Sequence, residues 1–416
     1  MKKLVYLIIF FLYSTVMNAQ LKDLVQGTDS NFGLSYGNTY PTTGMPYGMH
    51  MWSAQTGKNG DGFKYMYAVD KIRAFSQSHQ CSPWVSDYAV YSFMPMVGEL
   101  VVNQDARATK FSHDNEIAKP HYYKVTFDNG ITTEMAPTTR GVHLRFSYPT
   151  TGDAYLVLDG YTDMSEIKID PAKRQISGWV NNQRFVNDSK SFRNYFVVQF
   201  DKSFEDYGVW ENQKDEVFPQ KLDGSGKGYG AFIKFKKGSK VQAKAASSYI
   251  SAEQALITLN KELGKDKNLE VTKARGQKTW NEVLNRIVVE GCTDEQMKTF
   301  YSCLFRANLF SRKFYERKEN GEPYYYSPYN GKIYDGYMYT DNGFWDTFRS
   351  QFPLTNILHP TMQGRYMNAL LAAQEQCGWL PSWSSPGETG GMLGNHSISL
   401  LADAWAKGIR DFDPEK

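Results

Sequence analysis

The stretch SAEQALITLNKELG, residues 251–264, marks the point where the sequence changes from a β-strand pattern to an α-helix pattern. It begins with Ser251, a residue type that often caps helix N-termini, and ends with Gly264, a frequent residue at helix C-termini. The whole chain has 416 residues, which exceeds the roughly 250–300 residues at which one hydrophobic core stops growing. The sequence therefore predicts an α+β protein with several domains, β-structure coming first.

Residues 20–250 have the pattern of a β-sandwich. Short runs of alternating apolar and polar residues recur, among them YYKVTF (122–127), AYLVLDGY (154–161) and NYFVVQF (194–200). Turn signals such as DNG at 128–130 separate them. Many strands without helical periodicity between them are typical of a large sandwich, so we predict a β-sandwich domain over 20–250.

Residues after 250 are predicted to be helical. We interpret 251–290 as linker helices and 291–416 as part of a helical domain, with Thr293 and Glu295 at the start of its first helix. The segment WDTFRSQFPLTNIL (345–358) is predicted to be a helix that Pro353 interrupts. Two further helices are predicted in the segments 360–376 and 395–409.

The composition excludes some classes of partner and favours another. The formal net charge is only +3 and no basic tract is present, so nucleic acid is not expected to be a partner. Aromatic residues make up 15% of the chain. Because Tyr and Trp rings stack on the apolar faces of ligands, and sugar rings have such faces, this content favours a carbohydrate ligand.

The first residues resemble a cleaved secretory signal peptide, which we assign to 1–19. Lys2 and Lys3 precede the apolar run LVYLIIFFLYSTVM, which is shorter than the about 20 residues that a membrane span needs. An uncleaved anchor is the alternative. We expect an exported, periplasmic or secreted protein with no stable membrane span after cleavage. Its cysteines number only four, and their spacing indicates neither a disulfide framework nor a zinc site.

Four loop segments are unusually rich in Gly, aromatic and polar residues, and they are the candidate functional segments. One of them, DNGFWDTFR (341–349), places two carboxylates and an arginine among aromatic rings. Charged residues are seldom buried without a partner, so this segment forms either a structural ion pair at a helix start or the lining of a polar pocket. For 26–57, a loop stabilised by its own side chains is the alternative. For the other two segments, the alternatives are a structural role for His79 and a surface or wall position for Glu388. The four segments are 26–57, 75–88, 341–349 and 378–397.

At these segments the sequence resembles the calcium-dependent exo-α-mannosidases of glycoside hydrolase family 92. The matching words are GNTYPTTGMPYG (37–48), HQCSPWVSDY (79–88), FWDTFR (344–349), and GWLPSW (378–383) followed by MLGNHSISLLADAWAKGI (392–409). The resemblance implies an N-terminal β-sandwich, the first part of an (α/α)6 barrel, and an active site between them. It also implies inverting hydrolysis of α-mannose-terminated glycans with bound Ca²⁺.

Site residues are carried over from this resemblance one by one. Asp346 would accept hydrogen bonds from mannose hydroxyls, and Arg349 would donate to them or hold Asp346. An Asp–Arg pair at i,i+3 on one helix is the alternative. The full set of expected substrate-binding residues is Gly37, His79, Trp84, Trp345, Asp346 and Arg349. Weaker candidates are Phe63, which replaces a Trp of many relatives, and Asp87, Glu388 and His396.

The catalytic acid and base, and the calcium ligands, are not identified in this sequence. An inverting glycosidase needs a carboxylic acid and a carboxylate about 6.5–9.5 Å apart, and the family's segments for them have no match. We therefore expect both catalytic groups beyond Lys416, the last residue of the sequence.

The predicted helices also amount to about half of a complete (α/α)6 barrel. We therefore expect a portion of the family's full length that lacks mannosidase activity by itself. A non-catalytic mannose-binding surface protein and another (α/α)6 enzyme, such as a phosphorylase-like protein, are the alternatives.

Overall fold

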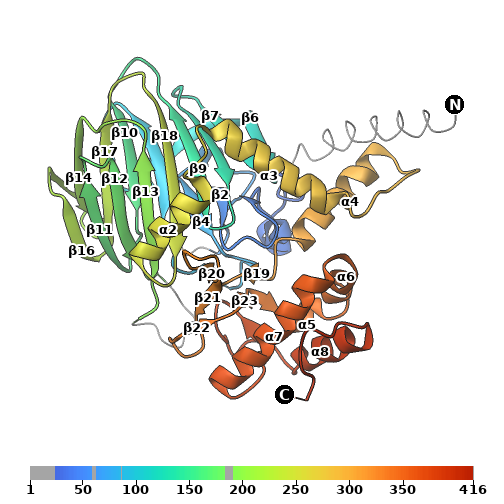
Figure 1. Ribbon diagram of the computed structural model, residues 1–416. Coiled ribbons are helices and arrows are strands. Elements are labelled where there is room, and N and C mark those ends of the chain that lie inside the picture. Colours follow the sequence, from blue (N-terminus) through green and yellow to red (C-terminus); the bar gives the residue numbers. More distant parts are fainter. Residues whose placement is uncertain (1–23, 59–61, 86, 183–190, 416) are drawn as a thin grey trace.

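The computed structural model describes residues 24–58, 62–85, 87–182 and 191–415. Figure 1 shows a pair of layered sheets, with helices beside them and a mainly helical part below. The predicted signal peptide, 1–19, lies outside the described residues. Among the described helices, none is both long and apolar enough to cross a bilayer.

One sheet has eight strands, all paired antiparallel. In spatial order they are β1 (Thr43–Gly44), β2 (Met51–Gln55), β4 (Ala74–Ser78), β5 (Ser92–Val97), β10 (Ala154–Asp159), β17 (Tyr229–Phe235), β14 (Asp206–Glu211) and β15 (Glu216–Pro219).

The second sheet has ten antiparallel strands. In spatial order they are β16 (Asp223–Lys227), β11 (Met164–Asp170), β12 (Gln175–Val180), β13 (Asn194–Phe200), β18 (Lys240–Ser248), β9 (Gly141–Ser147), β8 (Thr132–Pro137), β7 (Tyr122–Phe127), β6 (Thr109–Lys119) and β3 (Lys71–Ile72).

The main core lies between these two sheets. Phe75 and Phe93 of the first sheet belong to the same buried cluster as Leu144 and Phe146 of the second. Because side chains alternate along a strand, Phe196 and Val198 of β13 join this cluster while the intervening Val197 belongs to a different one. The predicted β-sandwich is confirmed.

Two helices cover the outer face of the ten-stranded sheet. Helix α2 (Ala252–Leu263) places Ala255 and Leu259 against Val197 and Ala246, and α3 (Leu269–Leu284) packs its first residue on β7 and β8. Ser251 caps α2 as predicted, because its hydroxyl accepts the Gln254 N–H at 3.1 Å. These two helices occupy the segment that the sequence marks as a linker.

The C-terminal part is built from helices and short strands. Its helices are α4 (Asp294–Ala307), α5 (Phe344–Thr347), α6 (Gln351–Leu358), α7 (Pro360–Cys377) and α8 (Ser397–Ala406). Its strands are β19 (Arg312–Lys313), β20 (Glu316–Arg317), β21 (Pro323–Tyr326), β22 (Ile333–Asp335), β23 (Tyr339–Thr340), β24 (Asn342–Gly343) and β25 (Trp383–Ser384). A short 3₁₀ helix, η1 (Phe32–Asn38), precedes the sandwich.

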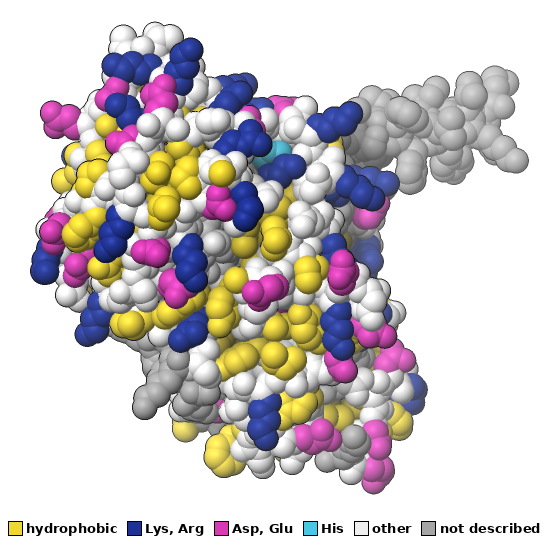
Figure 2. Space-filling view, turned by 60° about the vertical axis from the view of Figure 1, so that its left-hand side comes forward, with side chains coloured by type: hydrophobic (Ala, Val, Ile, Leu, Met, Phe, Trp, Pro, Cys, Tyr) yellow, Lys and Arg dark blue, Asp and Glu magenta, His cyan; other side chains and the backbone are white. Residues whose placement is uncertain are grey.

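A second buried cluster joins the two parts of the molecule. Met49, Tyr88 and Tyr249 of the sandwich part belong to it together with Phe344 of α5 and Met367 of α7. The surface, by contrast, mixes both signs of charge, and Figure 2 shows Lys and Arg side chains interspersed with Asp and Glu on one face.

One expectation about helix ends is wrong in detail and another is confirmed. The segment 345–358 is interrupted at 348–350, between α5 and α6, and not at Pro353. Pro353 lies in the first turn of α6, where a backbone N–H has no partner within the helix and its loss costs little. At α4, Thr293 caps the helix and Glu295 lies in its first turn as predicted, and Gln296 completes a capping box with Thr293.

Candidate functional site

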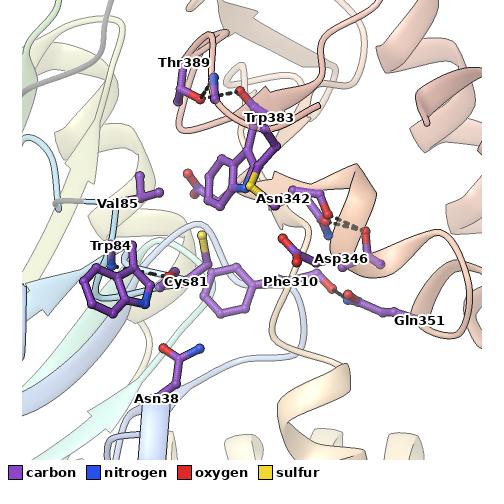
Figure 3. A pocket seen from close by; sticks show the side chains of 16 residues that line it. Asn38, Cys81, Trp84, Val85, Phe310, Asn342, Asp346, Gln351, Trp383 and Thr389 are labelled. Atoms are coloured by element: carbon purple, nitrogen blue, oxygen red, sulfur yellow. Dashed lines mark hydrogen bonds between the residues drawn. The ribbon is translucent and has the colours of Figure 1, made fainter. Parts of the chain in front are cut away.

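A pocket of about 590 Å³ lies where the sandwich meets the C-terminal part. Figure 3 shows side chains from both parts around it, with Asn38 and Trp84 on one side and Trp383 and Thr389 on the other. The lining residues are Asn38, Cys81, Ser82, Trp84, Val85, Phe310, Asp341, Asn342, Gly343, Asp346, Thr347, Gln351, Trp383, Thr389, Gly391 and Met392.

The pairing of β24 with β25 brings two loops of the pocket wall together. Gly343 lies opposite Trp383 in this antiparallel pair, and a Cβ on Gly343 would lie 2.2 Å from the indole Nε1 of Trp383. Glycine at this position therefore lets the Trp383 ring pack directly on the backbone. The carboxylate of Glu388 fixes the second loop, because it accepts the Ser382 N–H at 2.7 Å and the Gly390 N–H at 2.8 Å.

Asp346 projects into the pocket from the first turn of α5. Its Oδ2 lies 2.7 Å from where a Cβ on Gly343 would be, so the carboxylate lies close to the residue that caps this helix. The side chain is exposed, and its oxygens face the pocket (Figure 3). An exposed carboxylate in this position can accept hydrogen bonds from a ligand, and such charge-assisted bonds are the stronger kind.

The lining suits a neutral ligand with many hydroxyl groups. Amides, hydroxyls and the Asp346 carboxylate supply hydrogen-bonding groups, and the indoles of Trp84 and Trp383 supply apolar surface. No Lys or Arg is present in the lining, as far as the described residues go. The pocket therefore carries negative charge and disfavours anionic ligands.

Asp341 is held from behind by a buried cation. Arg312 forms an ion pair with its Oδ2, both side chains are fully buried, and the Tyr88 hydroxyl donates to the same oxygen at 3.0 Å. Arg312 also donates to the Met49 carbonyl oxygen, which belongs to the sandwich part. The remaining Asp341 oxygen, Oδ1, is buried without a hydrogen-bond partner among the described residues.

A second buried network lies behind the pocket around His79. Its Nδ1 donates to the Tyr88 carbonyl oxygen at 2.8 Å, so its Nε2 is the acceptor for the Nδ1–H of His50 at 2.7 Å and the Tyr249 hydroxyl at 3.1 Å. Burial lowers the pKa of His79 to about 4, and the charge of Arg312 adds to the effect. His79 is therefore neutral at neutral pH.

Asp87 completes this network as a buried ion. Burial alone would raise the pKa of its carboxyl, but the Lys64 ammonium at 2.9 Å and the neighbouring His79 hold it well below its usual range. The carboxylate accepts the His79 backbone N–H at 2.9 Å and the Ser78 hydroxyl at 2.9 Å. These contacts fix the segment that leads into Cys81–Val85 on the pocket wall.

Of the six expected substrate-binding residues, some line the pocket and others do not. Asp346 and Trp84 line the pocket, and the Trp84 side chain is 70% exposed. Arg349 is not part of the lining and does not bind Asp346: it donates to the Trp345 carbonyl oxygen at 2.9 Å and lies over the Phe348 ring. Because α5 ends at Thr347, Arg349 no longer shares a helical face with Asp346. Trp345 is 42% exposed outside the lining.

His79 and Gly37 also have other positions than expected. His79 is buried behind the wall instead of forming it, because its ring nitrogens are engaged with Tyr88, His50 and Tyr249. Gly37 lies beside the lining residue Asn38, at φ +74°, and a Cβ there would lie 1.9 Å from the Gly27 carbonyl oxygen. A close backbone approach therefore explains this glycine.

The weaker candidates lie around the pocket and outside its lining. Phe63 packs edge-on against Tyr36, with ring centroids 4.9 Å apart, in a small adjoining hollow that shares Asn38 with the pocket. His396 stacks on Phe348. Asp87 and Glu388 have the structural partners described above.

Sequence reasoning missed several lining residues, above all Asp341, Trp383 and Phe310. The first two lie within candidate segments, and only the fold shows that their side chains reach the pocket. Phe310 and Gln351 lie outside those segments, where the Gln351 amide donates to the Phe310 carbonyl oxygen. The sequence offers no signal for these two.

The described residues show no acidic cluster for a calcium ion, so its ligands stay unassigned. No group of three or more His, Cys, Asp or Glu side chains within the described ranges could hold a metal, whereas calcium takes six to eight oxygen ligands.

The catalytic acid and base are expected beyond Lys416, and the structure does not test this expectation. The described residues end at Glu415, so Lys416 itself lies outside them. The location of the two catalytic groups beyond Lys416 therefore stays a prediction.

Comparison with known proteins defines the class of this fold and site. The model of the glycosyl hydrolase family 92 N-terminal domain matches residues 23–248, and that of the family's catalytic domain matches 254–416. The chain belongs to glycosyl hydrolase family 92. The fold class and the resemblance predicted from the sequence are thereby confirmed.

Three individual proteins show how similar this chain is to its relatives. The chain is 43% identical to an inverting mannosidase of family 92 from Bacteroides thetaiotaomicron, with a TM-score of 0.91 over 94% of this chain and 53% of that one. A family 92 α-mannosidase from the same organism has a TM-score of 0.81 at 24% identity, over 94% of this chain and 55% of that one, which shows the fold. An uncharacterized secreted glycosidase of Arthroderma benhamiae is 21% identical over 74% of this chain and 44% of that protein. The chain thus spans about half the length of these relatives.

Proposed function

We propose that the pocket binds the terminal mannose of α-mannosidic glycans and that the protein is an exo-α-mannosidase acting with inversion. The single observation that carries this proposal is the combination of an acidic, indole-lined pocket with a 0.91 TM-score to an inverting mannosidase. A structure of a family 92 α-mannosidase from Bacteroides thetaiotaomicron with mannoimidazole supports mannose as the kind of sugar.

In this proposal, Asp346 and the two indoles bind the sugar. The Asp346 carboxylate accepts hydrogen bonds from mannose hydroxyls, and the Trp84 and Trp383 rings offer faces to the sugar's C–H groups. Asn342 is less available, because its amide already donates to Ser311 at 2.9 Å and its oxygen accepts from Thr347 at 2.7 Å. Its role is to shape the wall.

Proton transfer is not assigned to the pocket carboxylates. Inversion requires a protonated carboxylic acid on one side of the glycosidic bond and a carboxylate on the other. The charge of Asp341 is compensated by Arg312, and Asp346 is exposed to solvent, so neither has the apolar setting that keeps a general acid protonated. We therefore expect Asp346 to bind mannose without carrying the proton transfer.

Calcium dependence is also part of the proposal and rests on the resemblance alone. Since no calcium ligands are assigned among the described residues, no step above passes through the ion. Turnover or mannose binding measured after EDTA treatment and again after adding Ca²⁺ tests this point. Equal values in both states would contradict the dependence.

Export is proposed from the N-terminal sequence, and the secreted relative supports it. N-terminal sequencing of the mature protein checks the predicted cleavage near residue 19. Finding Met1 intact would refute it.

Titration calorimetry with mannose, together with an aryl α-mannoside turnover assay, tests the binding proposal. We expect saturable mannose binding that Asp346→Ala abolishes and Arg349→Gln leaves unchanged. Binding without turnover supports the assignment of Asp346 to binding alone. Turnover that Asp346→Asn removes would instead place the chemistry in this pocket. No mannose binding at all would refute the proposal.

A further inference from the structure

A second pocket, of about 280 Å³, lies between the end of α3 and the start of α7. It is separate from the first pocket and shares no lining residue with it. The residues that line it are Met45, Pro46, Tyr47, Thr139, Thr279, Val283, Arg286, Lys313, Tyr315, Tyr339, His359, Met362 and Arg365.

Three of these residues are cations, and none is acidic. Lys313 donates to the Pro46 carbonyl oxygen at 3.1 Å, Arg286 binds the Leu358 carbonyl oxygen, and Arg365 lies 4.5 Å from the Tyr337 ring centroid. None of the three forms an ion pair with a carboxylate in the described part of the chain. No carboxylate among the described residues therefore pairs directly with these three charges.

The carboxylate that acts on Lys313 is already engaged. Glu262 acts on the charge of Lys313, but both of its oxygens bind Arg140, one at 3.0 Å to the guanidinium and one at 2.8 Å to the backbone N–H. Burial lowers the pKa of Lys313 to about 8, and the charge of Arg140 adds to this effect. Burial thus disfavours the charged form of Lys313, and a bound anion would offset this free-energy cost.

The N-terminus of α7 adds a positive dipole end to the same pocket. This helix has 18 residues, its first turn includes the lining residue Met362, and no side chain caps its N-terminus. Unpaired N–H groups and the helix dipole make such an end favourable for anions. His359, at the cap position, is neutral, because Nδ1 accepts from Arg286 at 2.7 Å and Nε2 donates to the Asn308 oxygen at 2.7 Å.

We propose that this second pocket binds a tetrahedral oxyanion, namely phosphate either free or as the monoester of a sugar. Arg286, Lys313 and Arg365 supply ionic hydrogen-bond donors, and the uncapped helix end adds a fixed positive potential. The first pocket, with carboxylates and no lining cation, selects against the same ligand. The proposal does not depend on the function assigned to the first pocket.

Calorimetric titration with inorganic phosphate at constant ionic strength tests the proposal, with chloride as the balancing salt. We expect one saturable site, and we expect Lys313→Met and Arg365→Gln each to weaken it about tenfold or more, the value of one hydrogen bond to a charged group. Lys278→Gln, an exposed residue of α3 outside the lining, is the matched control and should bind like the unmodified protein.

A variant with little effect on packing keeps the test decisive. Arg286 is exposed, so Arg286→Gln should fold even if Lys313→Met does not, and it should also weaken phosphate binding. Further titrations with mannose 6-phosphate, and with mannose as the sugar without phosphate, separate free phosphate from a sugar monoester as the ligand. Mannose 6-phosphate binding more tightly than inorganic phosphate indicates a sugar monoester, and equal binding of the two indicates free phosphate. Absence of saturable phosphate binding, or unchanged binding by Arg286→Gln and Arg365→Gln, would overturn the proposal.

Discussion

Replacing Asp341 with Asn should destabilise the protein strongly although it changes few atoms. Asp341 has a positive φ of 62°, a conformation that Asn tolerates as well as Asp does, so the substitution isolates the loss of charge. Arg312 would then be a fully buried cation with only neutral acceptors, namely the new amide oxygen, the Met49 carbonyl and the Tyr88 hydroxyl. Removing one partner of a buried ion pair costs about 3–5 kcal/mol, and we expect a loss in this range.

Urea unfolding followed by tryptophan fluorescence measures this loss, and a double-mutant cycle assigns it to the pair. Arg312→Met should also destabilise, whereas Asp341→Asn combined with Arg312→Met should cost clearly less than the sum of the two. Asp170→Asn, which removes the exposed partner of Lys173, is the control and should leave the unfolding free energy unchanged. Asp341→Asn with the stability of the unmodified protein, or strict additivity in the cycle, would refute the reasoning.

Three further outcomes are expected. Asp346→Asn should weaken mannose binding about tenfold or more in calorimetry, because a charged hydrogen-bond acceptor is lost, whereas Arg349→Gln should not; equal effects would contradict the assigned positions. Gly37→Ala should lower the unfolding free energy by more than about 1 kcal/mol, since its Cβ would meet the Gly27 carbonyl oxygen; unchanged urea unfolding would contradict this. The folded-state pKa of His79, about 4, lies below the usual value of about 6.5, so its contribution to stability is complete above pH 6.5 and is lost as the pH falls toward 4. His79→Asn should reduce this pH dependence of the unfolding free energy, and an unaltered dependence would argue against His79 as its source.

Local features of the fold could be predicted from the sequence because they depend on neighbouring residues. Ser251 caps α2 through a hydroxyl three residues before the amide that it accepts, and such short-range signals are legible in a single chain. The order of strands could not be predicted in this way, since β11 pairs with β16 about sixty residues further on and no local pattern specifies that partner. Pro353 was misread for a related reason: a proline inside a predicted helix is also acceptable in its first turn.

The candidate site was predictable as segments and much less as individual residues. Fourteen of the sixteen lining residues lie in the four segments rich in Gly, aromatic and polar residues, the exceptions being Phe310 and Gln351. Composition identifies a loop that meets a ligand, but the direction of each side chain depends on backbone geometry. Arg349 shows this, because the end of α5 two residues earlier turns it away from Asp346.

The cluster that joins the two parts has a consequence for how this protein can evolve. Met49, Tyr88 and Tyr249 are remote from one another in the sequence, yet they pack with Phe344 and Met367 of the helical part. Recombination that exchanged either part for that of a distant homologue would separate these side chains from their partners and expose them to water. Selection should therefore transmit the sandwich and the helices as one heritable unit, with paired replacements across the boundary.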